Sequence, residues 1–391
     1  MSVKPEIFYL DKLLEESCKK VSPAIASDFS LDVKMAAWLQ QVRDRAATWV
    51  RELSIPTKKD EEWRFTNLSS MMKLSFQAPT LVDLDALNIA PFILPEVADS
   101  RLVFVNGVFA PQLSDVKGIE NQVFVGNLGQ LPVEYQKRVG NYLARQLGSE
   151  EVFTCLNTAG LTDAAVVWFP KNQVLEKPIH LLFIATETEI PILTQRRCLV
   201  VAESNSSGKI IEHCVTAEVI CPEAPNSHPY LTNTVTEIWV EENAEIDHTR
   251  VQRDAGAAFH IGKTAIAQAK NSRYTCNAIN LGGRLSRHNL EVVQMGEGTE
   301  TNLYGLAFLR NEQEIDTHSS ITLNYPNSVT DQLYKCIVDD KAHSIFNGKI
   351  YVSQTAQLTN AAQLNRNLLL SSGGKLLLIM FNVLMGQLLV S

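Results

Sequence analysis

The sequence predicts a mainly β protein, a parallel β-helix that follows a helical N-terminal region. The first observation is a change of character after about residue 160, where short alternating or β-branched runs replace helical periods. Short strands with frequent turns indicate a sandwich, a barrel or a solenoid. The runs are Ala165–Phe169, His180–Thr186, Arg197–Glu203, Lys209–Val215, Thr234–Val240, Arg273–Asn280, His288–Val293, Ser320–Leu323, Lys335–Val338 and Lys349–Val352.

A recurring turn favours the solenoid. A small residue follows Asn, Lys or Gly and opens the next strand at Ser207, Ala244, Ser272, Thr299, Ala342 and Ala356. The middle spacings, from Ala244 to Ser272 and on to Thr299, are 28 and 27 residues. Stacked turns need small residues at tight corners and a repeated inward apolar set. The polar run Gln363–Asn367 fits as well, since Asn side chains can stack along a solenoid. A two-sheet sandwich is the alternative that the pattern leaves open.

The region before the strands reads as helical. Apolar residues recur at spacings of three and four from Leu39 to Leu53, and Pro56 ends this helix. A second short helix is expected over Pro132–Gln146, with Gly148 beyond its end. The chain therefore divides into a helical region (1–95), a mixed α/β connecting region (96–164), a parallel β-helix (165–371) and an atypical apolar tail (372–391).

Charge and apolar segments exclude two classes of partner. The net charge is −8 and no cluster of Lys or Arg is present, which argues against nucleic-acid binding. The first twenty residues contain four acidic residues and no apolar stretch, so no signal or transit peptide is expected. Leu376–Ser391 is shorter than the ~20 residues of a membrane span, and Asn382 and Gln387 interrupt it.

The seven cysteines indicate a reducing compartment. They are widely spaced, odd in number and form no C-x-x-C, so we expect reduced, mostly buried thiols in a cytoplasmic protein. They are Cys18, Cys155, Cys198, Cys214, Cys221, Cys276 and Cys336.

Catalytic motifs are missing from the sequence. Gly348-Lys349 and Gly374-Lys375 lack the upstream glycine and the following hydroxyl of a phosphate-binding loop, so we expect no ATP hydrolysis by this chain alone. The sequence also contains no G-x-S-x-G, H-E-x-x-H or EF-hand loop. The sequence thus predicts no catalytic residue, no bound cofactor and no metal site.

Four weaker clusters each have a structural and a functional interpretation. His213-Cys214 with Cys221 is either core packing or part of a metal site. Arg287-His288-Asn289 follows Gly282-Gly283 and is either a hydrogen-bonded corner or an anion site. Asp316-Thr317-His318 resembles part of a catalytic triad, but no nucleophile is identifiable beside it. Cys336 alternates like a core residue of a strand, so burial is expected.

Several strings, in the same order along the chain, resemble the SufD family of iron–sulfur cluster assembly proteins. The match runs from about residue 35 to 371 and is closest to the cyanobacterial and plastid branch. One departure is Tyr334, where that branch is expected to have His. The strings are Pro56–Thr66, Leu102–Gly107, Leu281–Asn289, Lys335–Val338, Phe346–Ile350 and Gln363–Leu370.

The resemblance implies a right-handed parallel β-helix between a helical N-terminal and a helical C-terminal region. It also implies a non-catalytic scaffold role in a SufBCD complex, which handles the iron–sulfur cluster transiently. The partners would be the paralogue SufB, through the β-helices, and the ATPase SufC, through the C-terminal region. A solenoid that stops before its last turns leaves an unpaired edge near Asn365–Leu370, so we expect Asn365, Asn367 and Leu369 to contact a partner.

The tail departs from the family. After Ser371 the family continues with an acidic stretch, a C-S-H-G-A-T motif and a helical region, whereas this chain reads Ser372-Gly373-Gly374-Lys375 and then becomes apolar. Leu376–Ser391 has a possible coding sequence that, shifted by two bases, encodes T-A-D-N-V-Q-C-S-H-G-A-T-V-S-Q. We therefore expect a frameshift at about residues 372–376, and the family's interface His and Cys correspond to no residue here. Such a tail is expected to bury against a neighbouring turn, to associate or to aggregate.

A competing hypothesis is a carbohydrate-active β-helix enzyme or another solenoid binding protein. Such enzymes usually need paired carboxylates in a groove. The adjacent acidic pairs of the β region, Glu241-Glu242 and Asp339-Asp340, both fall at expected turns. The sequence does not decide between a homodimer and a heterodimer.

Overall fold

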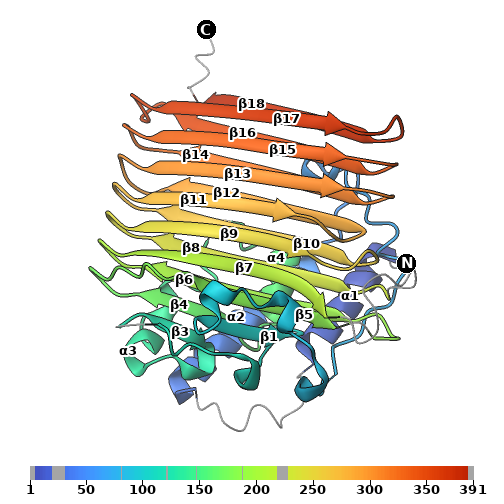
Figure 1. Cartoon of the computed structure of the whole chain (residues 1–391), viewed down its shortest axis with the longest axis horizontal. Coiled ribbons are helices and arrows are strands. Elements are labelled where there is room, and N and C mark those ends of the chain that lie inside the picture. Colours follow the sequence, from blue (N-terminus) through green and yellow to red (C-terminus); the bar gives the residue numbers. More distant parts are fainter. Residues whose placement is uncertain are drawn as a thin grey trace.

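Most of the chain forms a parallel β-helix with two strands per turn (Figure 1). The computed structural model describes residues 5–19, 31–80, 82–119, 122–146, 148–186, 188–217 and 228–385. In these residues the first sheet has the order β17-β15-β13-β11-β9-β7-β5-β1-β2, and the second sheet has the order β18-β16-β14-β12-β10-β8-β6-β4-β3. Apart from the antiparallel pairs β1–β2 and β3–β4, neighbours in each sheet are parallel. The predicted parallel β-helix is confirmed, and the sandwich alternative is wrong.

Strands extend beyond the expected β-helix region of residues 165–371, because β1, β2 and β3 precede it and β18 follows it. In the first sheet they are β1 (Arg101–Val105), β2 (Val108–Phe109), β5 (Ile179–Thr186), β7 (Ser207–Ala217), β9 (Glu245–Arg253), β11 (Arg273–Asn280), β13 (Glu300–Leu309), β15 (Val329–Val338) and β17 (Asn360–Leu369). In the second sheet they are β3 (Phe124–Asn127), β4 (Ala165–Phe169), β6 (Leu193–Ala202), β8 (Leu231–Val240), β10 (Phe259–Gln268), β12 (Leu285–Gln294), β14 (Glu314–Leu323), β16 (His343–Ser353) and β18 (Lys375–Met385).

The described helices are α1 (Pro5–Cys18), α2 (Val33–Glu52), α3 (Val133–Gln136) and α4 (Val152–Ala159). Helix α2 confirms the amphipathic helix expected before Pro56. The expected helix over Pro132–Gln146 is wrong in extent, because α3 is a single turn and the backbone at Ala144 is left-handed, with φ of 59°. Short 3-10 turns occur at Glu61–Trp63, Leu84–Ala86, Ala90–Phe92, Pro95–Val97, Pro111–Leu113, Leu128–Gln130 and Val139–Asn141.

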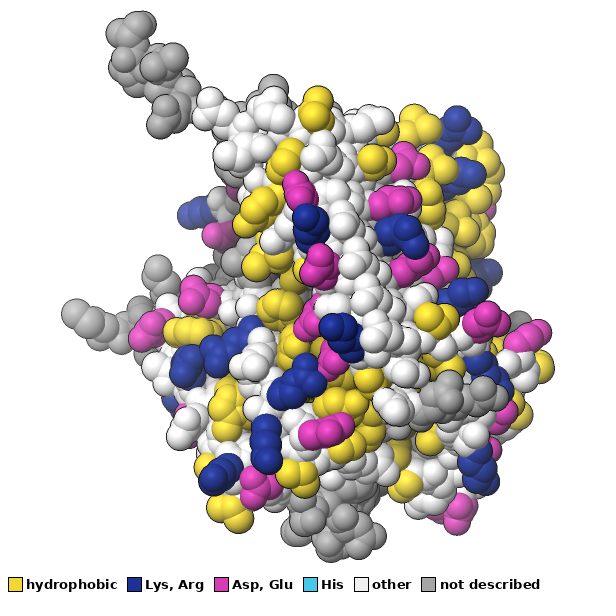
Figure 2. Space-filling view, turned by 90° about the vertical axis from the view of Figure 1, so that its left-hand side faces the viewer, with side chains coloured by type: hydrophobic (Ala, Val, Ile, Leu, Met, Phe, Trp, Pro, Cys, Tyr) yellow, Lys and Arg dark blue, Asp and Glu magenta, His cyan; other side chains and the backbone are white. Residues whose placement is uncertain are grey.

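Asparagines build one corner of the solenoid. Asn205, Asn243 and Asn271 have φ of 60°, 56° and 55°, a left-handed conformation that Asn adopts more readily than most residues. Their amides form a ladder between turns, with Nδ2 to Oδ1 distances of 3.1 Å (Asn243 to Asn205) and 3.3 Å (Asn271 to Asn243). Figure 2 views this side of the stack, where uncharged side chains and backbone form a pale vertical band. The repeated turn is therefore a stacked asparagine corner.

A buried small residue follows each of these asparagines, as Ala244 and Ser272 show. The expected corner residue Ser207 is off by one position. Ser206 is the buried residue after Asn205, whereas Ser207 begins β7.

Within residues 165–371 three strands, β9, β10 and β13, were not predicted, because their inward positions are polar or small. In β9 the inward residues include His248 and Arg250, and in β10 they include His260 and Gly262. In β13, Gly305 takes such a position. Period-two hydrophobicity is the signal by which strands are recognised, and it is absent where the interior itself is hydrophilic.

The N-terminal region covers the outer face of the first turns. Leu10, Val50 and Leu156 of α1, α2 and α4 pack in one cluster with Leu231 and Phe259 of the second sheet. A second layer on the first sheet includes residues 82–93. The described α-helices gather around the lower turns in Figure 1, whereas the 3-10 turn at Glu61–Trp63 reaches β14 and β16, where Glu62 contacts His318 and Lys349. The α-helices therefore cover only the start of the solenoid.

Candidate functional site

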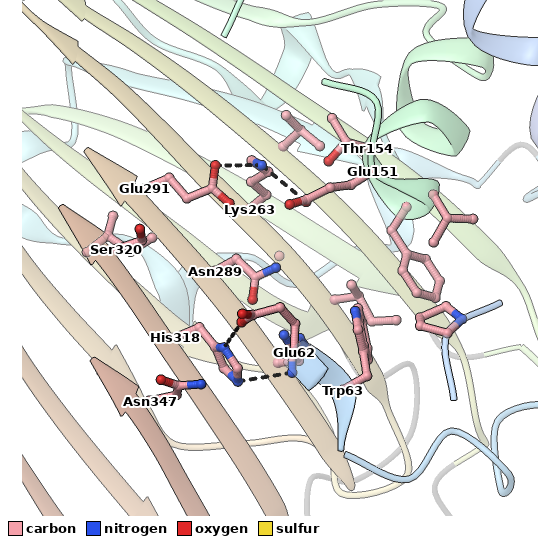
Figure 3. A pocket seen from close by; sticks show the side chains of 18 of the residues that line it. Glu62, Trp63, Glu151, Thr154, Lys263, Asn289, Glu291, His318, Ser320 and Asn347 are labelled. Atoms are coloured by element: carbon pink, nitrogen blue, oxygen red, sulfur yellow. Dashed lines mark hydrogen bonds and ion pairs between the residues drawn. The ribbon is translucent and has the colours of Figure 1, made fainter. Parts of the chain in front are cut away.

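A groove of about 430 Å³ crosses the outer face of the second sheet (Figure 3). Its floor consists of outward side chains from β8, β10, β12, β14 and β16. One wall belongs to residues 56–66, here called the N-terminal strap, and another to the start of α4 at Glu151–Thr154. The strap, Pro56–Thr66, is one of the segments that carry the resemblance in the sequence.

Arg287 of β12 anchors the strap. The indole of Trp63 lies over its guanidinium, 3.9 Å from the carbon to the ring centroid, an arrangement typical of a cation–π contact. Arg287 is ion-paired with Asp316 of β14, and both side chains are 1% exposed. The hydroxyl of Thr66, at the other end of the strap, hydrogen-bonds the same carboxylate. Trp63 and Thr66 of the strap therefore both contact one buried ion pair on the second sheet.

A second anchor forms around Glu62. Its carboxylate pairs with Lys349 of β16 and accepts a hydrogen bond from Nδ1 of His318, 3.3 Å away. His318 also contacts Asp316, with 2.9 Å between Nε2 and Oδ1. The hydrogen bond from His318, and then Lys349, lower the pKa of Glu62 to about 2 against the opposing effect of burial. Burial alone would lower the pKa of His318, but Asp316 and Glu62 raise it.

Lys263 of β10 closes the other end of the groove. Its Nζ lies 2.8 Å from Glu291 of β12 and 3.1 Å from Glu151 before α4. Burial raises the pKa of Glu291, while Lys263 opposes this shift. This three-residue bridge ties α4 to the sheet as Glu62 ties the strap.

A polar row runs along the middle of the floor. The register places Lys263, Asn289, His318 and Asn347 side by side on four neighbouring strands. The Oδ1 atoms of Asn289 and Asn347 are buried and have no hydrogen-bond partner among the described residues. The floor therefore has acceptor capacity for a polar group, while the charged groups of the groove are mostly paired with one another.

The structure places the Arg287–Asn289 string in the middle of β12, so its expected position at a corner is wrong. Arg287 and Asn289 face the groove, whereas His288 points inward, because alternate residues of a strand face opposite sides. Thr264 of β10 contacts His288 Nε2 at 2.9 Å in the interior.

Asp316 and His318 do meet in the groove, as the sequence hypothesis supposed. The side-chain partners of His318 are Asp316, Glu62 and Arg287, and none of these carries a hydroxyl or thiol. In the described part of the chain, His318 therefore has the contacts of an anchoring residue and no triad forms.

The thiol–imidazole cluster does not assemble. His213 packs outside the first sheet against His180, with 5.6 Å between ring centroids, whereas Cys214 belongs to the interior core. Cys221 lies outside the described residues. No group of three or more His, Cys, Asp or Glu in the described ranges is arranged to hold a metal ion. Cys336 is buried, as expected for a core position.

The three expected interface residues lie on β17, the outermost strand of the first sheet. Asn365, Asn367 and Leu369 pair with Tyr334, Cys336 and Val338 of β15, all of which are buried. The expected interface residues therefore end the inward columns of the solenoid, and no further turn among the described residues covers them.

The strap contacts were not predicted from the sequence. Trp63 and Arg287 each belong to a recognised string, but the two strings lie far apart along the chain. The only signal was the conjunction of a tryptophan within an otherwise charged segment and an arginine on a polar strand. A single sequence does not show that the two meet.

The fold and the groove define a β-helix protein whose N-terminal strap packs against its second sheet. Two family models match the sequence of this chain: the SufBD protein N-terminal region over residues 26–181, and the SufBD core domain of the SUF system for FeS cluster assembly over residues 183–377. The chain belongs to the SufBD family of iron–sulfur cluster assembly proteins.

Similar curated proteins agree with the family. A Synechocystis protein named as an iron–sulfur cluster assembly SufBD family protein is 46% identical over 334 residues, which cover 85% of this chain and 74% of that protein. The chloroplastic protein ABCI7 of Arabidopsis thaliana is 29% identical, over 95% of this chain and 76% of its own length. The SufD protein of Escherichia coli is 28% identical, over 81% of this chain and 70% of that protein.

Proposed function

We propose that the chain is a non-catalytic scaffold subunit of an iron–sulfur cluster assembly complex of the SufBCD type. It pairs with SufB through the end of its β-helix and joins the ATPase SufC in the same complex. Family membership and the relatives named SufD support this role. The missing phosphate-binding loop supports the division of labour with a separate ATPase.

The observation that carries the proposal is the open end formed by β17 and β18. Each is the outermost strand of its sheet, so each presents one edge of unpaired backbone groups. Leu369, Leu378 and Met380 continue inward columns but are 49%, 39% and 43% exposed. Asn365 Oδ1 is buried yet has no partner among the described residues. A second solenoid end placed here would pair the edge and bury these side chains.

The experiment is co-purification of tagged SufB and SufC with the chain and with an edge variant. Leu369→Lys places a charge within the open end, which opposes pairing, and we expect recovery of the ternary complex to fall at least tenfold. Leu281→Lys, at an exposed leucine far from the end, is the matched control and should recover fully. Equal recovery with both variants would refute pairing through β17.

The carbohydrate-active alternative has one observation to test. Glu151 and Glu291 share Lys263 in the groove, so paired carboxylates are present there. Glu241 and Asp340, from the two acidic pairs seen in the sequence, lie at turns. Polysaccharide turnover that Glu291→Gln abolishes would favour an enzyme, and we expect none.

No described helix is long and apolar enough to cross a membrane. We propose that the complex works in the cytoplasm, or in the plastid stroma, because one relative is named as chloroplastic.

A further inference from the structure

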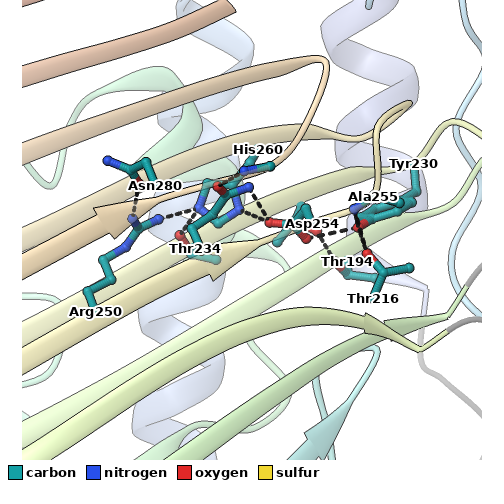
Figure 4. Close-up of polar contacts among 12 residues, drawn as sticks. Thr194, Thr216, Tyr230, Thr234, Arg250, Asp254, Ala255, His260 and Asn280 are labelled. Carbon is teal, nitrogen blue, oxygen red and sulfur yellow. Dashed lines mark hydrogen bonds and ion pairs between the residues drawn. The ribbon is translucent and has the colours of Figure 1, made fainter. Parts of the chain in front are cut away.

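Part of the solenoid interior is polar, and its hydrogen bonds form a chain (Figure 4). Arg250 of β9 donates from Nη1 to Asn280 Oδ1 at 2.8 Å and from Nη2 to His260 Nε2 at 2.6 Å. His260 donates from Nδ1 to Asp254 Oδ2 at 2.9 Å. The hydroxyl of Tyr230 donates to Asp254 Oδ1 at 2.9 Å. Each of these groups is therefore satisfied by its neighbours.

Arg196 of β6 belongs to this interior but has no such partner. It lies between Thr194, which bonds Thr232 inside the solenoid, and the core residue Cys198, so its side chain faces inward. It is 3% exposed, and Nε, Nη1 and Nη2 have no hydrogen-bond partner among the described residues. A guanidinium carries five donors and stays charged, so its unpaired burial is costly.

Asp254 is a buried carboxylate of the same interior, but its hydrogen bonds go to other groups. Burial raises the pKa of Asp254, and His260 and then the charge of Arg196 lower it. However, the carboxylate accepts hydrogen bonds from His260, Tyr230 and Gln252, the last at 2.8 Å. Asp254 therefore forms no hydrogen bond with Arg196.

The other charged groups of this interior have partners. Glu212 lies 3.3 Å from His248, and burial, which would lower the pKa of His248, is outweighed by Cys276 and Glu212, which raise it to about 9. His248 is thus a cation at neutral pH. Burial lowers the pKa of His260, which is neutral and accepts from Arg250.

Arg250 and His248 therefore each have a hydrogen-bond or ion-pair partner, whereas the guanidinium of Arg196 has none among the described residues.

We propose that Arg196 is the centre of a binding site for one small monovalent anion, such as chloride, inside the β-helix. One unpaired guanidinium offsets the charge of one monovalent ion, and a divalent ion would lose more hydration on burial. The surrounding residues, among them Cys214, Tyr230 and Thr234, are each more than nine-tenths buried, which favours a small ion. The site is independent of the scaffold role and of the groove.

Diffraction from crystals of the full chain in sodium bromide tests the site directly. We expect an anomalous difference peak within hydrogen-bond distance of the Arg196 guanidinium. Density without anomalous signal at that place would identify water and overturn the proposal. Bromide peaks confined to the protein surface would overturn it equally.

Unfolding in solution gives a second test. Sodium chloride should raise the thermal midpoint by about 2–4 °C more than sodium gluconate at the same ionic strength, because chloride binds the folded state. Arg196→Gln should abolish this difference and Arg196→Lys should keep part of it. Arg366→Gln, at an exposed arginine of β17, is the control and should respond like the parent chain. Equal responses of the parent chain to both salts would contradict the proposal, and the bromide experiment decides if Arg196→Gln fails to fold.

Discussion

Trp63 lies on Arg287, with 3.9 Å between the guanidinium carbon and the ring centroid, and this contact joins the N-terminal strap to the outer face of the solenoid. Arg287 is held from the other side by Asp316, so the ring rests on a fixed cation. Trp63 belongs to the family's N-terminal region and Arg287 to its core domain, so this contact is one of several that join the two.

The stacking contact predicts a graded response to substitution. Trp63→Leu keeps an apolar side chain but removes the ring, so it should lower the free energy of unfolding by about 1–2 kcal/mol. Trp63→Phe, which retains a smaller aromatic face, should lose less. Urea unfolding monitored by circular dichroism measures both, and an equal loss would show that the aromatic face contributes nothing.

The ion pair beneath the strap predicts a larger effect. Asp316→Asn removes the negative charge beside the buried Arg287 and should cost about 3–5 kcal/mol. Asp331→Asn, at a half-buried position of β15, is the control and should stay within about 0.5 kcal/mol of the parent chain. Similar losses of unfolding free energy for Asp316→Asn and Asp331→Asn would show that the buried Arg287–Asp316 ion pair does not contribute the expected stability.

The second anchor predicts a pH dependence. The folded-state pKa of Glu62 is lowered from 4.5 to about 2, so its stabilisation is fully present above pH 4.5 and is lost as the pH falls towards 2. The pKa of His318 is raised above 6.5, so its stabilisation is present below pH 6.5 and is lost as the pH rises through the folded value. The contribution of this pair to the free energy of unfolding is therefore greatest between about pH 4.5 and 6.5.

Thermal midpoints of the parent chain and of Glu62→Gln test this expected pH dependence of stability. The gap between them should be wide at pH 5.5 and should narrow by pH 3. Glu61→Gln, at the exposed neighbouring residue, should show no such change. A gap that widens on acidification would contradict the assigned pairing.

At the asparagine corner, we expect alanine and glycine substitutions to lower the free energy of unfolding by different amounts. At Asn271, with φ of 55°, alanine must adopt a left-handed backbone and should cost about 1–2 kcal/mol. Glycine adopts that conformation freely and should cost less, although both lose the amide bond to Asn243. Urea unfolding that finds glycine no better than alanine would show that the left-handed φ does not limit substitution at this corner.

The sequence predicted the solenoid wherever its interior is apolar. The run Thr234–Val240 and the corner residues Ala244 and Ser272 carried that information, because burial imposes a period of two on strands and small size on corners. β9 and β10 were hidden, since His248, Arg250 and His260 point inward.

The groove was predictable only in pieces. Asp316 and His318 share one strand, so their proximity followed from a spacing of two. Their contacts with Glu62 and Trp63 depend on how the strap crosses the sheet, which is a tertiary relationship that local patterns do not encode.

Hydrogen exchange of the chain with and without SufB and SufC tests the central claim, the docking of a partner on the end of the solenoid. The account predicts strong protection of backbone amides in β17 (Asn360–Leu369) on complex formation, because an edge strand that gains a neighbour pairs its free groups. Amides of β9, which has neighbours on both sides, should change little. A complex that forms with β17 unchanged and with new protection at the groove instead would contradict the account.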